Sequence, residues 1–187
     1  TNTVWLDVWA KGSELGFTAY SNEQDFVNKT NGITKTITDT TYTSGSVGIF
    51  CDAGTTDYQR NFQATFLSYK TADYRYVNGA YLINKGTSIG YGVGSDVFNY
   101  DSVNNTLAFK DGIGTKAILD TSVSVSDFTT IVKLDLENQA QKTRTSADSG
   151  VLFRANLTNG KNDITGYYLQ YFARKAGVLK AEVDTVA

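Results

Sequence analysis

The sequence predicts an all-β fold, and more specifically an antiparallel β-sandwich, on three observations. The chain is rich in strand-forming aromatic residues, with 12 Tyr and 10 Phe, and it lacks Pro. Apolar and polar residues alternate with a period of two, and Gly-, Asn- and Asp-rich turns separate the alternating runs. No window combines a helical apolar stripe with capping residues. A chain of 187 residues is long enough for one substantial core, so we expect a single domain over 1–187.

Nine segments carry the strand pattern most clearly. In chain order they are 4–11, 15–21, 46–53, 61–69, 106–111, 128–137, 149–156, 165–174 and 177–184. Turn sequences such as "DAGTTD", "KDGIG" and "RKAG" lie between them. Many short antiparallel strands at close spacing are typical of a sandwich, and we expect the jelly-roll arrangement.

Alternation assigns the side chains of segment 4–11 to two faces. Val4, Leu6, Val8 and Ala10 share an apolar face, and Trp5, Asp7 and Trp9 stand on the opposite one. The first face is expected to enter the core. The second face is expected to lie on the surface of the sheet.

The same reasoning applies to the last three segments. Arg154 alternates with Val151, Phe153 and Ala155, so it falls on the face opposite to them. Tyr168 and Gln170 share one face of 165–174, and Glu182 lies on the polar face of 177–184. If these strands were neighbours of 4–11, their polar and aromatic faces would merge into one surface.

Such a surface suits a sugar, because aromatic rings stack on the apolar C–H face of a sugar ring and charged groups bind vicinal hydroxyls. Asp52 comes after the "GSVGIF" run within segment 46–53 and points with Phe50 away from Val47 and Ile49. The expected carbohydrate-binding residues are Arg154, Tyr168, Glu182, Trp5, Asp7, Trp9, Gln170 and Asp52. An ordinary solvated sheet face is the alternative, and Trp5 and Trp9 could instead fill a second layer of the core.

Longer motifs carry a family resemblance. The pieces "DSGVLFRAN", "GYYLQYFARKAGVLKAEV", "VWLDVWAKG" and "SGSVGIF" resemble the concanavalin-A-like, laminin-G-like jelly rolls. They are most similar to the fructan-binding modules attached to levanases and inulinases. The resemblance implies binding of a terminal fructose or another glycan. It makes Arg154 the arginine of "GVLFR" and Tyr168 the second tyrosine of "GYY", with Glu182 on the next strand.

The motifs occur in a different order from that of the family, in which "GVLFRA" and "GYY" precede "W…KG" and "GSVG". We therefore expect a circular permutation, with 1–67 as the second half of the parent fold and 97–187 as the first half. Segment 68–96 would bridge the parent termini. Thr1 and Ala187 would lie close together, where the parent has a hairpin loop. Two half-repeats that close into one domain are the alternative.

Composition excludes several function classes. The chain has no His, which removes His-based catalysis and His metal sites. A net charge of −2 gives no basis for nucleic-acid or anionic-membrane binding. No apolar run approaches the ~20 residues that span a bilayer. A single Cys and the absence of Met favour a module of a longer, secreted or surface-attached bacterial protein, and we expect the module to be monomeric.

We expect no catalysis and a polysaccharide or oligosaccharide as the partner. Jelly-roll glycosidases carry Glu-x-Asp-x-Glu on one strand, but "VKLDLEN" places Lys133 at the first of these positions, before Asp135 and Glu137. No cofactor is expected, although Asp-rich segments 52–57 and 96–101 leave a calcium ion open. A structural or adhesive spacer and a small glycoside hydrolase are the alternative functions.

Overall fold

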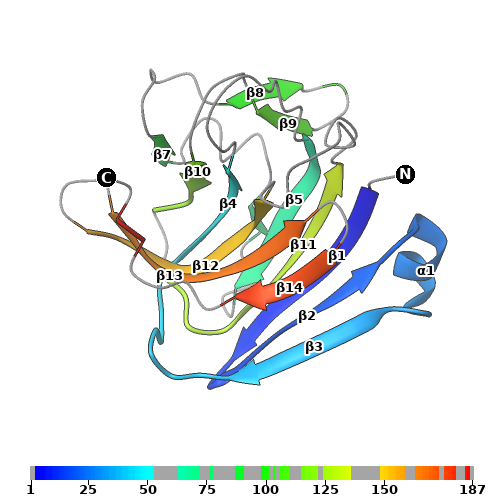
Figure 1. The fold of residues 1–187 in the computed structure, drawn as a ribbon, viewed down its shortest axis with the longest axis horizontal. Helices are drawn as coiled ribbons and strands as arrows, with labels where there is room; N and C mark the ends of the chain where they lie inside the picture. The colour runs from blue at the N-terminus through cyan, green and yellow to red at the C-terminus, as the bar shows by residue number, and fades with distance from the viewer. Residues whose placement is uncertain are drawn as a thin grey trace.

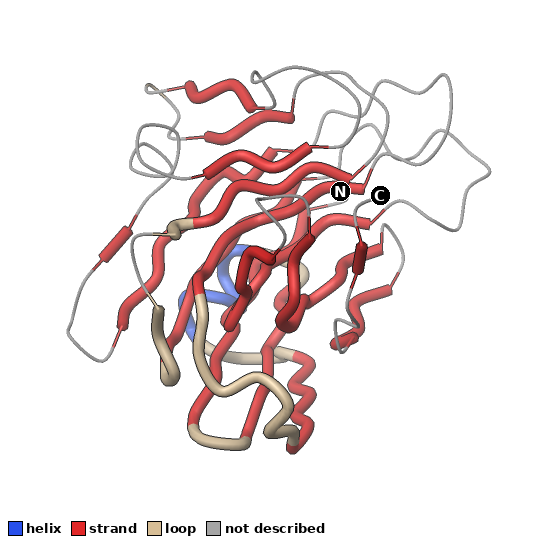
Figure 2. Tube along the Cα trace, turned by 90° about the vertical axis from the view of Figure 1, so that its left-hand side faces the viewer, coloured by secondary structure: helices blue, strands red, loops and turns tan. Residues whose placement is uncertain are grey.

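The computed structural model describes residues 3–52, 63–71, 76–77, 87–90, 98–101, 103, 106–109, 115–121, 124–135, 148–158, 163–172, 175–179 and 184–185. Within these ranges the chain forms two antiparallel sheets that face each other, with a single short helix (Figure 1). Strands make up almost all of the regular structure (Figure 2). The all-β prediction is therefore confirmed.

The first sheet contains eight strands of the described chain. Its order is β3 (Ile33–Thr38), β2 (Glu14–Tyr20), β1 (Thr3–Lys11), β11 (Phe128–Asp135), β5 (Gln63–Thr71), β9 (Thr106–Phe109) and β8 (Phe98–Asp101), and β6 (Tyr76–Val77) also pairs with β5. The two-residue turn at Gly12–Ser13 joins β1 to β2 and sets their register, in which Lys11 pairs with Glu14 and Trp9 with Gly16.

The second sheet contains seven strands within the described ranges. Its order is β14 (Lys175–Leu179), β13 (Asp163–Phe172), β12 (Asp148–Thr158), β4 (Ser46–Asp52), β10 (Thr115–Leu119) and β7 (Thr87–Gly90), and β15 (Asp184–Thr185) pairs with β13. All nine expected strand segments contain strand, although 177–184 is divided between β14 and β15. The strands β3, β6, β7, β8 and β10 were not among the predicted segments.

The main core lies between the sheets and follows from the alternation. Along β1, buried and half-buried residues alternate without interruption. The buried side chains that face inward include Val4, Leu6, Val8, Leu15, Phe17, Val47, Ile49, Phe128, Val132, Leu134, Val151, Phe153, Tyr167 and Leu169. Phe128 of the first sheet meets Phe153 of the second with ring centroids 5.4 Å apart. Each buried Val, Leu, Ile or Phe side chain stabilises the fold by about 1.5–3 kcal/mol relative to full exposure.

A second apolar cluster covers the outer face of the second sheet. Phe50, Ala117, Leu119, Leu152 and Ala155 form it, and Tyr168 packs against it. The Tyr168 ring meets Phe50 edge-on, with centroids 5.5 Å apart. Around Leu152 this face is therefore packed and apolar, whereas alternation predicted a polar and aromatic face.

The helix α1 (Glu23–Asn28) was not predicted from the sequence. It has only six residues and no buried side chain, so it shows no apolar stripe. Capping holds it instead: the side chain of Asn22 accepts a hydrogen bond from the backbone N–H of Asp25 at 2.9 Å. Lys29 ends the helix in the left-handed conformation, with φ of 56°. The Phe26 ring meets Tyr20 of β2 edge-on, at 5.7 Å between centroids.

The circular permutation stays a prediction, as does the jelly roll. Thr1 and Ala187 lie outside the described residues, and so does most of the bridging segment 68–96. The described strands nearest to the two ends belong to different sheets, with β14 and β15 in the second sheet and β1 in the first.

Candidate functional site

Arg154 lies at a β-bulge, which changes the face on which its side chain stands. The pairing of β12 with β13 is interrupted between Phe153 and Asn156, and its pairing with β4 between Leu152 and Ala155. Arg154 adopts a positive φ of 46°. Alternation therefore breaks after Phe153, and Ala155 joins Leu152 on the outer face. The predicted exposure of Arg154 is wrong, because the residue is only 1% exposed.

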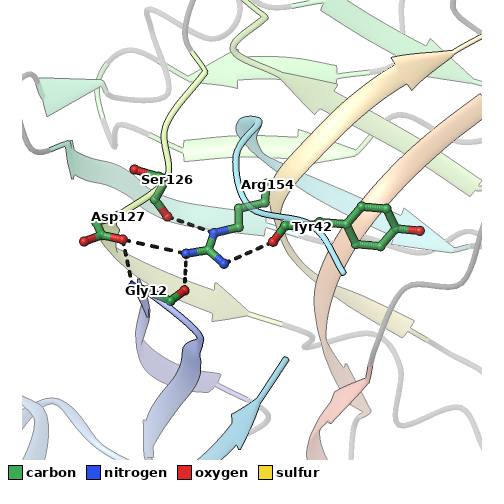
Figure 3. A network of polar contacts seen from close by, with 5 residues as sticks. All are labelled: Gly12, Tyr42, Ser126, Asp127 and Arg154. Carbon is green, nitrogen blue, oxygen red and sulfur yellow. Dashed lines mark hydrogen bonds and ion pairs between the residues drawn. The ribbon is translucent and has the colours of Figure 1, made fainter. Parts of the chain in front are cut away.

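The guanidinium of Arg154 binds three backbone carbonyls (Figure 3). Its Nε donates to Ser126 O at 2.8 Å, Nη1 to Tyr42 O at 3.1 Å and Nη2 to Gly12 O at 2.7 Å. The Asp127 carboxylate lies 3.7 Å from Nη2 and also accepts from the Gly12 N–H. One buried cation thus joins the β1–β2 turn, the β3–β4 connection and the β10–β11 connection. We call these contacts the Arg154 network.

Tyr167 of β13 binds the β3–β4 connection next to the Arg154 network. Its hydroxyl accepts from the Tyr42 N–H at 3.0 Å and donates to Asp39 Oδ1 at 2.5 Å. The Tyr42 ring meets the Tyr167 ring edge-on at 5.2 Å. Burial, followed by the hydrogen bond to Asp39, raises the pKa of Tyr167 above its usual value of 10.0. The phenol is therefore held in its protonated form.

We expect this raised pKa to appear as a loss of stability at alkaline pH. Because the folded-state pKa lies above the unfolded value, the contribution of Tyr167 is fully present below pH 10.0 and is lost as the pH rises through the folded-state pKa. Thermal unfolding of the wild type and of Tyr167→Phe, followed from neutral to alkaline pH, checks this. The variant should be less stable at neutral pH and should decline less on the alkaline side. Parallel declines in the two proteins would contradict the assignment.

Trp5, Asp7 and Trp9 lie half-buried on the outer face of the first sheet, where alternation places them. Their partners across β11 extend this face: Lys133 pairs with Trp5, Ile131 with Asp7 and Thr129 with Trp9. We call this surface the β1 face.

Trp9 rests on a glycine of the neighbouring strand. Gly16 pairs with Trp9, and a Cβ at Gly16 would overlap the indole ring, with Trp9 Cε2 at 2.6 Å. The indole N–H donates to the Glu14 carboxylate at 3.1 Å. The missing side chain of Gly16 therefore lets the indole lie over β2, and the bond to Glu14 fixes its orientation.

Trp5 and Asp7 each have a cation beside them. The Lys133 ammonium lies 5.1 Å from the Trp5 ring centroid. Lys29 binds Asp7 with 2.7 Å between Nζ and Oδ2, and the same ammonium lies 3.9 Å from the Phe26 ring centroid. The ion pair is partly exposed, and such pairs contribute about 0–1 kcal/mol. The pair connects the end of α1 to the β1 face and places a positive charge beside Asp7.

The other predicted site residues lie elsewhere. Tyr168 stands on the outer face of the second sheet, against Phe50. The backbones of Gln170 and Asp52 belong to β13 and β4 of that same sheet, and Glu182 lies outside the described residues. The condition for a merging of the faces, that these strands are neighbours of β1, is not met, because β1 and β12 belong to different sheets.

Sequence reasoning missed the contribution of Gly16, Lys29 and Lys133 to the β1 face. The Gly12–Ser13 turn was the available signal for Gly16, because a two-residue turn there fixes the pairing of Gly16 with Trp9. Lys29 reaches Asp7 only through the end of α1, which was not predicted.

The described residues contain neither a cluster of metal-ligating side chains nor a membrane-spanning helix. Within the described ranges, no three Asp, Glu, Cys or His side chains come together as a metal site. Residues 53–57 and 96–97 of the Asp-rich segments lie outside these ranges, as does Glu137. No helix in the described part of the chain is long and apolar enough to cross a membrane.

Comparison with known proteins adds no assignment. No protein-family model matches the chain. No curated protein matches it significantly either.

Proposed function

We propose that the chain is a non-catalytic carbohydrate-binding module that holds a glycan on the β1 face. The observation that carries this proposal is the Trp9 indole, which lies over Gly16 on the same half-exposed face as Trp5. A planar aromatic ring fixed on a sheet surface can stack against the C–H face of a sugar. Because Gly16 and Glu14 already hold Trp9 in place, little conformational freedom would be lost on binding.

The spacing of the two tryptophans favours an oligosaccharide segment over a single terminal sugar. Trp5 and Trp9 are four residues apart on one extended strand, which separates their Cα atoms by about 13 Å at ~3.3 Å per residue. That separation exceeds one sugar ring, so a ligand that contacts both indoles would run along β1. The hydroxyls of Thr18 and Thr34, 2.9 Å apart on the neighbouring strands, add polar groups to the same surface.

The terminal-fructose expectation receives less support. It required Arg154, Tyr168 and Glu182 to act together, but Arg154 is buried and bound to three carbonyls. Tyr168 lies on the outer face of the other sheet. The β1 face therefore gives no reason to expect tighter binding of fructans than of other glycans.

Binding is favoured over hydrolysis by the state of the carboxylates on the β1 face. Asp7 is paired with Lys29, and Glu14 accepts the Trp9 indole N–H. Glycoside hydrolysis needs two carboxyl groups facing one bond, one of them able to donate a proton. Asp7 and Glu14 are instead engaged in holding side chains of the binding surface.

Replacing either tryptophan should weaken binding. Loss of one stacked ring removes about 0.5–1.5 kcal/mol beyond the area term, so Trp5→Ala and Trp9→Ala are each expected to lower the affinity about tenfold. Calorimetric titration with oligosaccharides of increasing length, from inulin, levan and β-glucans, measures this. Trp9→Phe keeps a ring and should retain most of the affinity, and Tyr168→Phe on the opposite sheet should be neutral.

The same titration separates the alternatives. The affinity should rise with chain length until the ligand contacts both indoles. If the wild type retains no glycan, or if both alanine variants bind as the wild type does, the proposal is wrong. The structural or adhesive module would then be favoured.

A further inference from the structure

The turn between α1 and β3 contains an asparagine followed by a glycine, and the fold constrains both positions. Asn31 has a φ of 53°, a left-handed conformation that Asn adopts more readily than most residues. At Gly32, a Cβ would lie 2.6 Å from both Thr18 Cγ2 and Tyr20 Cε1. A larger residue at position 32 would therefore displace Tyr20. Asn31 and Gly32 are both exposed.

The side-chain amide of Asn31 helps to hold this turn together. Its Nδ2 donates to Asp25 Oδ1 at 2.8 Å. Asp25 also accepts from Thr30 Oγ1 at 2.9 Å and from Asn22 Nδ2 at 2.6 Å. These bonds, with that from Asn31 first, keep the pKa of Asp25 below its usual value. Asp25 is thus an anionic acceptor surrounded by donors, and position 31 must supply one of them.

We propose that Asn31 is a site of spontaneous deamidation, and that the loss of its amide opens the turn around Asp25. The Gly32 backbone nitrogen would attack the side-chain carbonyl carbon of Asn31, forming a five-membered succinimide as ammonia leaves. Water then opens the ring to an aspartyl or isoaspartyl residue. Gly32 carries no side chain to hinder its nitrogen, and water is the only co-reactant.

The product would reverse the electrostatics of the turn. A carboxylate at position 31 cannot donate to Asp25, and two like charges at hydrogen-bonding distance repel each other. Asp25 lies in the first turn of α1, but its carbonyl also supports the end of the helix, because it accepts the Thr30 N–H at 3.0 Å. Opening the turn would therefore loosen Lys29, which caps α1 and binds Asp7. This inference does not depend on the proposed glycan binding.

The first test follows the modification itself. The folded protein is incubated at mildly alkaline pH and digested at intervals, and the peptides are weighed for the mass increase that accompanies replacement of NH2 by OH. Asn28 is an internal control, because it is exposed in the same region but is followed by Lys29. Asn31 should deamidate several-fold faster than Asn28. If Asn31 keeps its amide in the folded protein while the denatured chain loses it, the site is wrong.

The second test isolates the consequence. Asn31→Asp imitates the aspartyl product, and Asn28→Asp makes the same charge change away from the Asp25 contacts. Hydrogen exchange at residues 22–31 should be several-fold faster in Asn31→Asp than in Asn28→Asp. Equal exchange in the two variants would show that the turn does not depend on the Asn31 amide.

Discussion

Replacing Arg154 with alanine is expected to lower the free energy of unfolding by about 3–5 kcal/mol, a large share of the roughly 5–15 kcal/mol of a typical domain. The guanidinium donates to Gly12, Tyr42 and Ser126, and hydrogen bonds to a charged group are worth roughly 1.5–3 kcal/mol each. Removing the side chain would leave a buried cavity among these carbonyls. Denaturant titration of the wild type and the variant measures the loss.

Arg154→Lys provides the matched control. Lysine keeps the positive charge, but its single ammonium cannot reproduce the planar fork that reaches three carbonyls. We expect it to recover only part of the lost stability. If Arg154→Ala kept its full stability but lost glycan binding, Arg154 would be a ligand contact and the structural role assigned to it would be wrong.

The second large effect is expected at Gly45, which lies directly against the bulge. Its φ is 157°, and a Cβ there would overlap the Arg154 carbonyl carbon and lie 2.6 Å from Ala155 N. Unfavourable backbone geometry and overpacking each cost roughly 1–3 kcal/mol. Gly45→Ala should therefore destabilise the fold by about 2–6 kcal/mol in the same denaturant titration.

Gly12→Ala is the control for Gly45→Ala. Gly12 also has a positive φ, of 56°, but nothing lies within 4 Å of its added Cβ. It should therefore lose only the conformational part, about 1 kcal/mol. Equal losses at the two glycines would show that close packing against the bulge contributes nothing.

Alternation predicts the face of a residue correctly where the strand is regular. In β1 the pairing with both neighbours is uninterrupted, so alternation placed Trp5, Asp7 and Trp9 correctly. In β12 the bulge after Phe153 interrupts the alternation, so the face predicted for Arg154 was wrong and its side chain is buried. The bulge depends on Gly45 and Gly166, which allow close backbone approach from outside β12, and a pattern read within one strand does not contain that information.

Two other features could not be predicted because they depend on contacts between distant parts of the chain. The three carbonyls that Arg154 binds lie 28 to 142 residues away in the chain, so no local motif predicts these contacts. Alternation assigns a residue to a face of its own strand but does not reveal which sheet holds that strand. Trp5 and Tyr168 were therefore predicted on one surface, although they stand on opposite sides of the sandwich. The helix α1 depends on its caps at Asn22 and Lys29.

A glycan array probed with the wild type, a Trp5→Ala/Trp9→Ala double variant and Tyr168→Phe is the most direct test of a binding surface on β1. We expect the wild type and Tyr168→Phe to retain the same set of glycans, and the double variant, still folded by circular dichroism, to retain none of them. Retention of those glycans by the folded double variant would contradict the assignment of the β1 face.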